Sequence, residues 1–203
     1  REGKAITNFK KTLAEPQSDM AQQALKDPYL FAFLTLHEAY VEKDVEQGLI
    51  DHIQKFLLEL GQGFAFIGRQ VHLHVGQVDY YIDLLFYHYK LRCFIVVELK
   101  VGKFDPRDVG QINFYLSAVD DAMCSAEDKP TIGLLLCRTK DNITAEYALR
   151  NISSPIGVAE YTTKLVGKLP KELKGILPSI SEIEEEIGRK ESKIISQKDE
   201  RTK

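Results

Sequence analysis

Asp83, Glu98 and Lys100 interrupt two stretches that otherwise have the composition of buried strands, YYIDLLFYH and CFIVVELK. Charged side chains are costly in such surroundings unless they are paired or bind an ion. Side chains alternate across a strand, so Glu98 and Lys100 emerge on one face, and an antiparallel pairing would bring Asp83 beside Glu98. Two carboxylates suit a hard cation such as Mg2+, and a neighbouring lysine can position or help deprotonate a water molecule. The spacing therefore predicts a metal-assisted hydrolytic site.

A structural ion pair is the competing interpretation of the same residues. Lys100 could pair with one of the two carboxylates, and structural ion pairs are common. That interpretation explains two of the three charges and leaves the third without a role. The strands and helices on either side of these residues are needed to distinguish a metal site from a structural ion pair.

Three strand candidates surround these residues: GFAFIGRQVHLHV, VDYYIDLLFYH and CFIVVELK. They are rich in β-branched and aromatic residues, and their short connections predict an antiparallel meander. Before them, apolar residues at three- and four-residue steps predict one amphipathic helix from Tyr40 to Leu60, ended by Gly61. After them, the pattern predicts a helix from about Pro106 to Asp121, with Asp105 as its N-cap.

The second half of the chain continues the alternation of strands and helices. TIGLLLC, from Thr131 to Cys137, is wholly apolar, which favours a strand buried on both faces in a parallel pairing. A helix over Ile143–Asn151 and a last strand over Ile156–Tyr161 follow. The expected fold is α/β, a mixed sheet made of an antiparallel meander plus a parallel strand and flanked by helices.

Three regions are expected along the chain. Residues 1–27 are polar and are interpreted as a partly ordered lead-in with at most one short helix. Residues 28–179 form the main domain, in which an apolar segment from Pro28 to Leu34 covers one edge of the core. Residues 180–203 are a charge-dense tail, helical or disordered.

The ordered set of blocks resembles the PD-(D/E)xK nuclease superfamily, with Asp83 and then Glu98-Leu99-Lys100 as the motif. The helix after the lysine carries Gln111-Ile-Asn-Phe-Tyr115, which is similar to the QxxxY element of the RecB-like branch. FLLELGQGFAFIGRQ, YIDLLFYH, VVELK, GQINFYL, IGLLLC and IGVAEY together resemble the YhcG-type nuclease domain of bacteria. The resemblance covers roughly 27–179 and implies a restriction-endonuclease-like core.

The resemblance also implies a function. It implies a Mg2+-dependent phosphodiesterase, with Mn2+ as an alternative ion; DNA is the expected substrate, and RNA is the alternative. Asp83, Glu98 and the Leu99 carbonyl would hold the metal, and Lys100 would act on the attacking water. Gln111 would orient the phosphate or the water.

The superfamily usually adds a glutamate from the helix before the meander. Glu46 is the first choice, and Glu42, one turn earlier, is the alternative. A solvated helix-surface carboxylate remains the other interpretation of either residue. The alternative for Gln111 and Tyr115 is that they pack at the interface of helix and sheet.

The net charge of −3 gives no global attraction to nucleic acid, so binding requires a local patch. Arg69, Gln70, Lys103 and Tyr115 are the candidates for it. Further cations near the meander are Lys90, Arg92 and Arg107. Scattered solvated cations are the simpler account of any one of them.

His72 and His74 share a strand face in an HxH spacing that can ligate a transition metal. No Cys or further His lies close by in the sequence to complete a site. The sequence therefore favours an ordinary exposed strand face here.

Composition sets the remaining expectations. With 44% hydrophobic and 28% charged residues, the chain falls in the soluble globular class. Cys93, Cys124 and Cys137 show no CxxC spacing, and two of them lie in apolar runs, which favours reduced thiols and a cytoplasmic location. No apolar run is long enough to span a membrane.

The chain begins at Arg1, and the resemblance implies a preceding helical domain, so we expect a fragment of a longer protein. A homo-oligomer is a further expectation. The rival function is a non-catalytic binding or assembly module of a bacterial defence or mobile-element system. Binding of Mg2+ or Mn2+ distinguishes the two.

Overall fold

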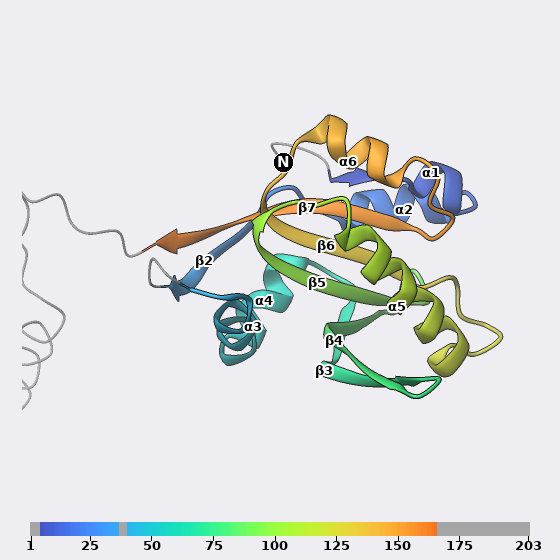
Figure 1. Ribbon diagram of the computed structural model, residues 1–203, viewed down its shortest axis with the longest axis horizontal. Coiled ribbons are helices and arrows are strands. Elements are labelled where there is room, and N and C mark those ends of the chain that lie inside the picture. Colours follow the sequence, from blue (N-terminus) through green and yellow to red (C-terminus); the bar gives the residue numbers. More distant parts are fainter. Residues whose placement is uncertain (1–4, 37–39, 166–203) are drawn as a thin grey trace, which may run out of the picture. The chain divides into compact units, whose positions relative to one another are not determined.

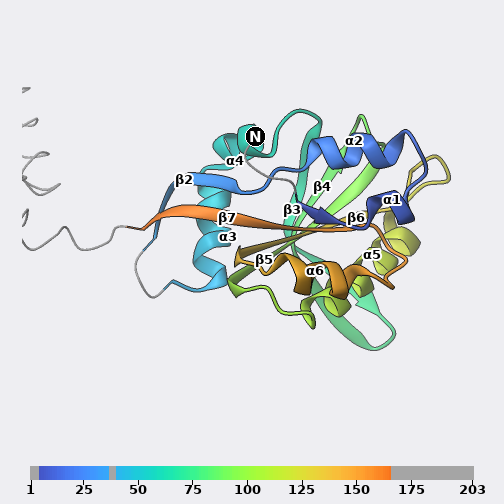
Figure 2. The ribbon, with the colours of Figure 1, turned by 90° about the horizontal axis from the view of Figure 1, so that it is seen from above.

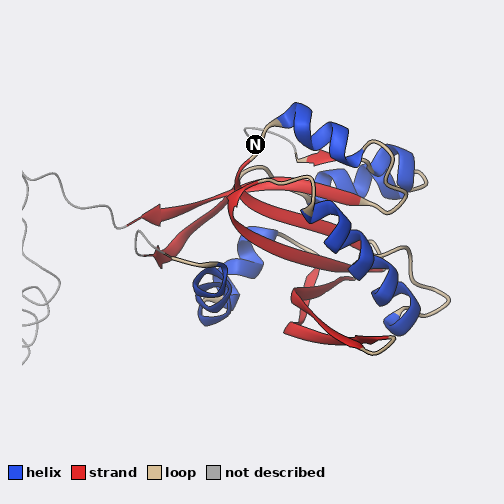
Figure 3. Ribbon diagram, in the orientation of Figure 1, coloured by secondary structure: helices blue, strands red, loops and turns tan. Residues whose placement is uncertain are grey.

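The computed structural model describes residues 5–36 and 40–165, which form a mixed sheet with helices on both faces (Figure 1, Figure 3). The strands of this part are β1 (Ile6–Thr7), β2 (Tyr29–Leu36), β3 (Phe64–Val75), β4 (Val78–His88), β5 (Cys93–Lys103), β6 (Ile132–Thr139) and β7 (Ile156–Leu165). The helices are α1 (Phe9–Thr12), α2 (Gln17–Ala24), α3 (Glu42–Asp51), α4 (Ile53–Leu60), α5 (Asp108–Met123) and α6 (Asn142–Leu149). The predicted α/β class is confirmed. The predicted tail over 180–203 lies outside the described residues, and the predicted domain boundaries stay a prediction.

The sheet has the strand order β1-β7-β6-β5-β4-β3, and β2 also pairs with β7. The strands β3, β4 and β5 pair antiparallel in sequence order, so the predicted meander is confirmed. A two-residue turn, Gly76–Gln77, joins β3 to β4, because Val75 and Val78 are partners. Gly76 has a φ of 67°, and tight hairpin turns need such positive values.

The other half of the sheet is parallel. β5 pairs with β6 and β6 with β7, with α5 and α6 as the crossover helices. Residues 132–137 of β6 are all buried, which is the reason that the run is apolar throughout. The predicted parallel strand is confirmed.

Two hydrophobic clusters lie on opposite faces of the sheet. One contains residues of α3 and α4, and the other contains residues of α5 and α6. Figure 2 shows α1 and α2 on one side of β7 and α6 on the other. Val97 and Leu99 belong to the first cluster and Val96 to the second. By alternation, Glu98 and Lys100 therefore face the α5 side.

The predicted single helix over Tyr40–Leu60 is wrong in one respect, because it is two helices. His52 leaves the helical conformation, with φ −117° and ψ 35°, between α3 and α4. Buried residues of both helices, among them Leu49 and Phe56, reach the same cluster. One non-helical residue leaves the apolar periodicity intact, so the pattern alone does not reveal the break.

The region before Asp27 is more structured than predicted. The expectation of at most one short helix is wrong, because β1, α1 and α2 all lie there. Phe9 and Leu25 are buried in the core. The apolar segment after Pro28 is β2, which pairs parallel with the second half of β7.

Two element boundaries also differ. The predicted N-cap is wrong: α5 begins at Asp108, with Arg107 at the cap position. The Asp105 carboxylate instead accepts a hydrogen bond from the Arg107 backbone N–H at 2.9 Å and pairs with its guanidinium group. β7 runs four residues further than predicted, to Leu165. None of the helices described is long and apolar enough to cross a membrane.

Candidate active site

Asp83 and Glu98 meet where β4 separates from β5. The backbone pairing of the two strands ends at Leu84 and Val97. Beyond this pair, backbone N–H groups bond to side chains instead of to backbone carbonyls. The Leu99 N–H donates to Asp83 Oδ2 at 3.0 Å, and the Asp83 N–H donates to Glu98 Oε1 at 3.2 Å. The fork in the sheet therefore places the two carboxylates side by side.

Glu98 is almost fully enclosed, with 2% of its surface exposed. Burial raises the pKa of Glu98 to about 8, and the neighbouring charge of Asp83 adds to this rise. The hydrogen bond from Asp83 and the charge of Lys100 act in the opposite direction. A carboxyl group in this state gains much from an added cation, because a cation stabilises its charged form.

Lys100 lies on the same face as Glu98 and is half-buried. Its backbone carbonyl accepts a hydrogen bond from the Tyr161 hydroxyl at 3.3 Å. Among the ion pairs of residues 5–36 and 40–165, none within 4.0 Å involves Lys100. The competing interpretation, an ion pair of Lys100 with Asp83 or Glu98, is therefore not present among these residues.

Glu46 reaches the site from α3 and is 7% exposed. The Gln70 side-chain amide donates to Glu46 Oε2 at 2.7 Å and to Asp83 Oδ1 at 3.2 Å, so it bridges the two carboxylates. Burial raises the pKa of Glu46; the Gln70 hydrogen bond opposes the rise, and the charge of Asp83 adds to it. Glu42 is exposed, although its charge contributes to the raised pKa of Glu98. Of the two candidate glutamates, Glu46 is the one within the bridged group.

Helix α5 contributes Gln111 and Tyr115. The Gln111 amide donates to the Tyr115 hydroxyl at 3.0 Å. Burial raises the pKa of Tyr115, and after the opposing Gln111 hydrogen bond the charges of Glu98 and Asp83 raise it further. Tyr115 is therefore close to both carboxylates, while Gln111 is exposed at the rim.

The predicted nucleic-acid contacts are only partly gathered around this site. Arg69 is exposed and donates to the side chain of Gln47. Lys103 is exposed near the end of β5. Other cations are paired with nearby side chains: Arg107 with Asp105, Arg92 with Glu127, and Lys90 with Gln62. Lys90 and Arg92 lie in the turn that joins β4 to β5, at the end of the paired segment that is remote from the fork, so the structure does not bring them to the site.

Two interactions at the candidate site could not be predicted from the sequence. The Gln70 bridge arises from a residue with a positive φ of 45° in β3, and its GRQ context carries no signal for that geometry. The bond from Tyr161 to Lys100 joins residues far apart in the chain. Both depend on tertiary packing.

The donor set fits a hard divalent cation. Asp83 and Glu98 offer carboxylate oxygens, which are the ligands that Mg2+ and Mn2+ prefer. Burial raises the pKa of Glu98 more than the charge of Lys100 lowers it, so a cation bound at this carboxyl group would stabilise its charged form. Asp83, Glu98 and the Leu99 carbonyl remain the proposed ligand set.

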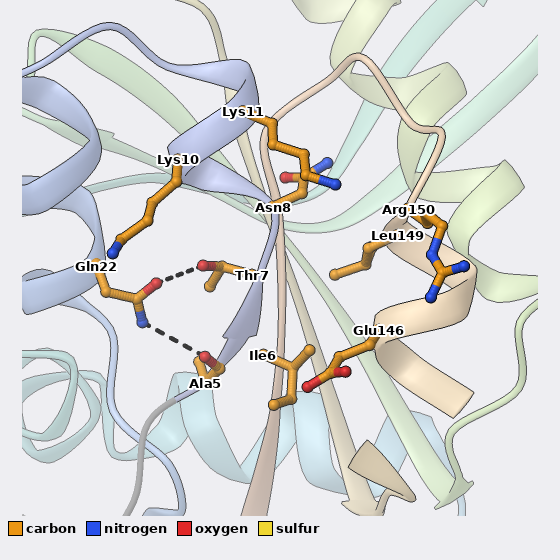
Figure 4. A pocket seen from close by; sticks show the side chains of 10 residues that line it. All are labelled: Ala5, Ile6, Thr7, Asn8, Lys10, Lys11, Gln22, Glu146, Leu149 and Arg150. Carbon is orange, nitrogen blue, oxygen red and sulfur yellow. Dashed lines mark hydrogen bonds between the residues drawn. The ribbon is translucent and has the colours of Figure 1, made fainter. Parts of the chain in front are cut away.

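A cavity of about 530 Å3 lies elsewhere, between β1, α1, α2 and α6 (Figure 4). Lys10, Lys11 and Arg150 line it together with Glu146. Gln22 closes one wall by hydrogen bonds to Thr7 and to the Ala5 carbonyl. None of the predicted site residues lines this cavity, so the geometry of the fork, rather than cavity volume, identifies the candidate site.

Comparison with known proteins supports the sequence resemblance. A relative named "Putative nuclease YhcG" from Escherichia coli (strain K12) is 42% identical over 146 residues. The match covers 72% of this chain and 39% of the relative, so the chain spans well under half of the relative's length.

Solved structures give more distant matches. A repair endonuclease from Pyrococcus abyssi has a TM-score of 0.42 and 18% identity, covering 64% of this chain and 50% of that chain. An EndoMS–dsDNA complex has a TM-score of 0.36 and 17% identity, covering 53% of this chain and 39% of that one. These likenesses are too remote to assign a substrate.

The family model described as the YhcG PDDEXK nuclease domain matches residues 22–178, which is most of the chain. The matched range includes Asp83, Glu98 and Lys100. This chain therefore belongs to the family of the YhcG PDDEXK nuclease domain.

Proposed function

We propose that the chain is a Mg2+-dependent nuclease that hydrolyses phosphodiester bonds in DNA. The observation that carries the proposal is the fork. There the Asp83 N–H donates to the Glu98 carboxylate and the Leu99 N–H donates to the Asp83 carboxylate, and Lys100 lies on the same face without an ion-pair partner within the described part. Mn2+ would serve in place of Mg2+, since it takes similar oxygen ligands.

Asp83, Glu98 and the Leu99 carbonyl would hold the ion. When bound, such an ion polarises the phosphate and makes a bound water more acidic. The Leu99 N–H fixes the Asp83 carboxylate, and the Asp83 N–H fixes that of Glu98. The ligands are thus held in place by strands β4 and β5 rather than by loops, which favours a fixed geometry.

Lys100 would act on the attacking water or on charge that develops on the phosphate. Within residues 5–36 and 40–165, no carboxylate lies within 4.0 Å of its ammonium group, so its charge would be available to the reacting groups. Glu46 would assist from α3, with Gln70 holding it in place at 2.7 Å. Gln111, oriented by Tyr115, would bind a phosphate oxygen from α5.

The choice of DNA over RNA rests on the family resemblance. Arg69, Lys103 and the amide groups near the fork would contact the sugar-phosphate backbone, because the chain has no overall positive charge. Such contacts position a strand without reading its sequence.

The test compares cleavage by the unaltered chain with that by Asp83→Asn and Lys100→Ala. Labelled single- and double-stranded DNA and RNA are incubated with the purified chain and Mg2+ or EDTA. We expect Mg2+-dependent cleavage of DNA, lost at least about 100-fold in both variants, since removal of one group that stabilises the transition state typically has that effect. Asp121→Asn, at an exposed carboxylate near the end of α5, is the matched control.

Calorimetry with Mg2+ separates the competing functions. Binding that is weakened by Glu98→Gln but kept in Lys100→Ala supports the proposed roles. Unchanged cleavage by Asp83→Asn would overturn the assignment. An unaltered chain that neither cleaves nor binds Mg2+ would instead be the non-catalytic assembly module.

A further inference from the structure

The end of the β3–β4 hairpin brings three metal-ligating side chains together. His74 on β3 is the direct cross-strand partner of Asp79 on β4, and His72 lies two residues further along β3. Alternation puts all three side chains on one face of the hairpin. The sequence alone suggested no third ligand for the HxH pair, and the strand register supplies it.

The three side chains converge on one point. His72 Nε2 and His74 Nδ1 each lie 2.8 Å from the same oxygen, Asp79 Oδ1. The ligand atoms of the three residues all lie within 4.8 Å of one another, and within the described residues no other set of three or more His, Cys, Asp or Glu side chains does so. Ligand atoms of a tetrahedral zinc ion lie about 3.3 Å apart, since each bond is about 2.0–2.1 Å long. Small side-chain rotations therefore suffice to admit an ion.

The surroundings leave room for the ion and its waters. The side chains of His72, His74 and Asp79 are 52%, 62% and 55% exposed. Three protein ligands with solvent access leave a fourth position for water, as in open zinc sites. The hairpin turn at Gly76–Gln77 fixes the distance between the two strands, so the ligands are presented by a defined register.

The ligand chemistry selects a different kind of ion from the one proposed at the fork. Two imidazole nitrogens and one carboxylate suit late first-row ions such as Zn2+, whereas Mg2+ prefers oxygen ligands alone. The simpler alternative is an exposed His–Asp cluster, which stabilises a protein very little. In the absence of an ion, the two imidazole rings share the Asp79 oxygen through hydrogen bonds of 2.8 Å each, so the same three side chains are already gathered where an ion could replace the shared protons.

This cluster is separate from the fork, although both lie on the same hairpin. Asp79 and Asp83 are four residues apart on β4, which corresponds to about 13 Å along a strand. Tyr81 lies between them on the same face and its ring is 5.3 Å from that of His72. One ion therefore cannot bridge the two places, and each can be tested in the absence of the other.

We propose that the end of the β3–β4 hairpin is a transition-metal site in which His72 Nε2, His74 Nδ1 and the Asp79 carboxylate hold Zn2+. Water completes the coordination. The ion clamps β3 to β4 beyond the fork, on the face that also carries Gln70 and Asp83.

The experiment uses the full chain carrying Asp83→Asn and Glu98→Gln, so that ions at the fork do not contribute. Zn2+ is titrated by calorimetry, and Co2+ is used as a spectroscopic probe because its d–d absorption reports the ligands directly. We expect one Zn2+ per chain, not displaced by a large excess of Mg2+. His74→Ala and Asp79→Asn should each weaken binding at least about tenfold, since even groups outside the ligand shell contribute 10- to 100-fold.

His52→Ala, at an exposed histidine between α3 and α4, is the matched control and should bind as before. Circular dichroism of each variant verifies that it is folded. In the chain that carries only Asp83→Asn and Glu98→Gln, Zn2+ should shift the ring NMR signals of His72 and His74 and raise the melting temperature. Unchanged stoichiometry and affinity in both ligand variants, or binding lost only in the control, would overturn the proposal. Because the test needs no nuclease activity, its failure is distinct from failure of the proposed function.

Discussion

At the scale of single residues, Glu98 carries the largest electrostatic cost in the site. It is buried beside Asp83, and its pKa is raised to about 8. A folded-state pKa above the ordinary value of 4.5 means that the folded chain binds a proton more tightly than the unfolded chain. The metal-free protein should therefore lose stability as this carboxyl group ionises.

The first prediction concerns pH. Glu98 should stabilise the fold fully below about pH 4.5 and lose that contribution as pH rises towards 8. Glu98→Gln removes the titration, so the variant should become more stable than the unaltered chain as pH rises from 5 to 8. Between pH 5 and 8, the free energy of unfolding of Glu98→Gln should rise relative to that of the unaltered chain by roughly 3–5 kcal/mol, at about 1.4 kcal/mol for each pKa unit.

Urea unfolding in EDTA at several pH values measures this difference. Glu146→Gln, at an exposed glutamate, provides the control and should show no such trend. A stability difference between Glu98→Gln and the unaltered chain that stays constant from pH 5 to 8 would contradict the buried, raised state of Glu98.

At the scale of elements, the position of α5 depends on its close approach to β6. A Cβ atom on Gly133 would lie 2.9 Å from Cδ1 of Ile112 and 3.3 Å from Cδ1 of Leu116. Both side chains are fully buried, so they have little room to move. The absence of a side chain at Gly133 thus lets α5 lie close enough to bring Tyr115 beside the carboxylates.

We predict that Gly133→Ala destabilises the chain by about 1–3 kcal/mol through overpacking between α5 and β6. Gly110→Ala is the matched control on α5 itself, where an added Cβ meets nothing within 4 Å. That variant should stabilise by about 0.5–1 kcal/mol, since alanine is the better helix former. Urea unfolding measures both, and equal effects of the two substitutions would contradict the packing argument.

The elements also show how far sequence reasoning reaches. The β-branched and aromatic composition of 78–88 and 93–100 predicted both strands, and the alternation of side chains along a strand predicted the shared face of Glu98 and Lys100, because both features are local. The break at His52 and the Gln70 bridge were not predictable, because they depend on packing against distant segments. The meeting of Asp79 with the HxH pair needed the exact strand register, which the sequence does not specify by itself.

At the scale of the whole molecule, the N-terminal segment is tied to the last strand of the fold. The Asn8 amide donates to the carbonyls of Ile152 and Ser154, and its oxygen accepts from the Ile156 N–H. These bonds join positions more than 140 residues apart. The polar composition before Asp27 concealed this role, because one buried asparagine has no distinctive sequence pattern.

We predict that Asn8→Ala destabilises the chain by about 2–4 kcal/mol, since it leaves three backbone groups without their partner. Asn151→Ala, at an exposed asparagine near the same loop, is the control and should change stability by no more than about 0.5 kcal/mol. Urea unfolding measures both variants. Equal stabilities would contradict the view that residues 5–27 are integral to the fold.

The Gln70 amide has a further consequence for how the fork accommodates charge. An amide nitrogen carries two hydrogens, and here each is directed at one carboxylate, Glu46 or Asp83. An ion held by Asp83 and Glu98 would leave the bond from Gln70 to Glu46 in place, because Glu46 is not among the proposed ligands. The neutral amide thus gives Glu46 and Asp83 a hydrogen-bond donor of their own, so neither carboxylate depends on the ion alone for a partner.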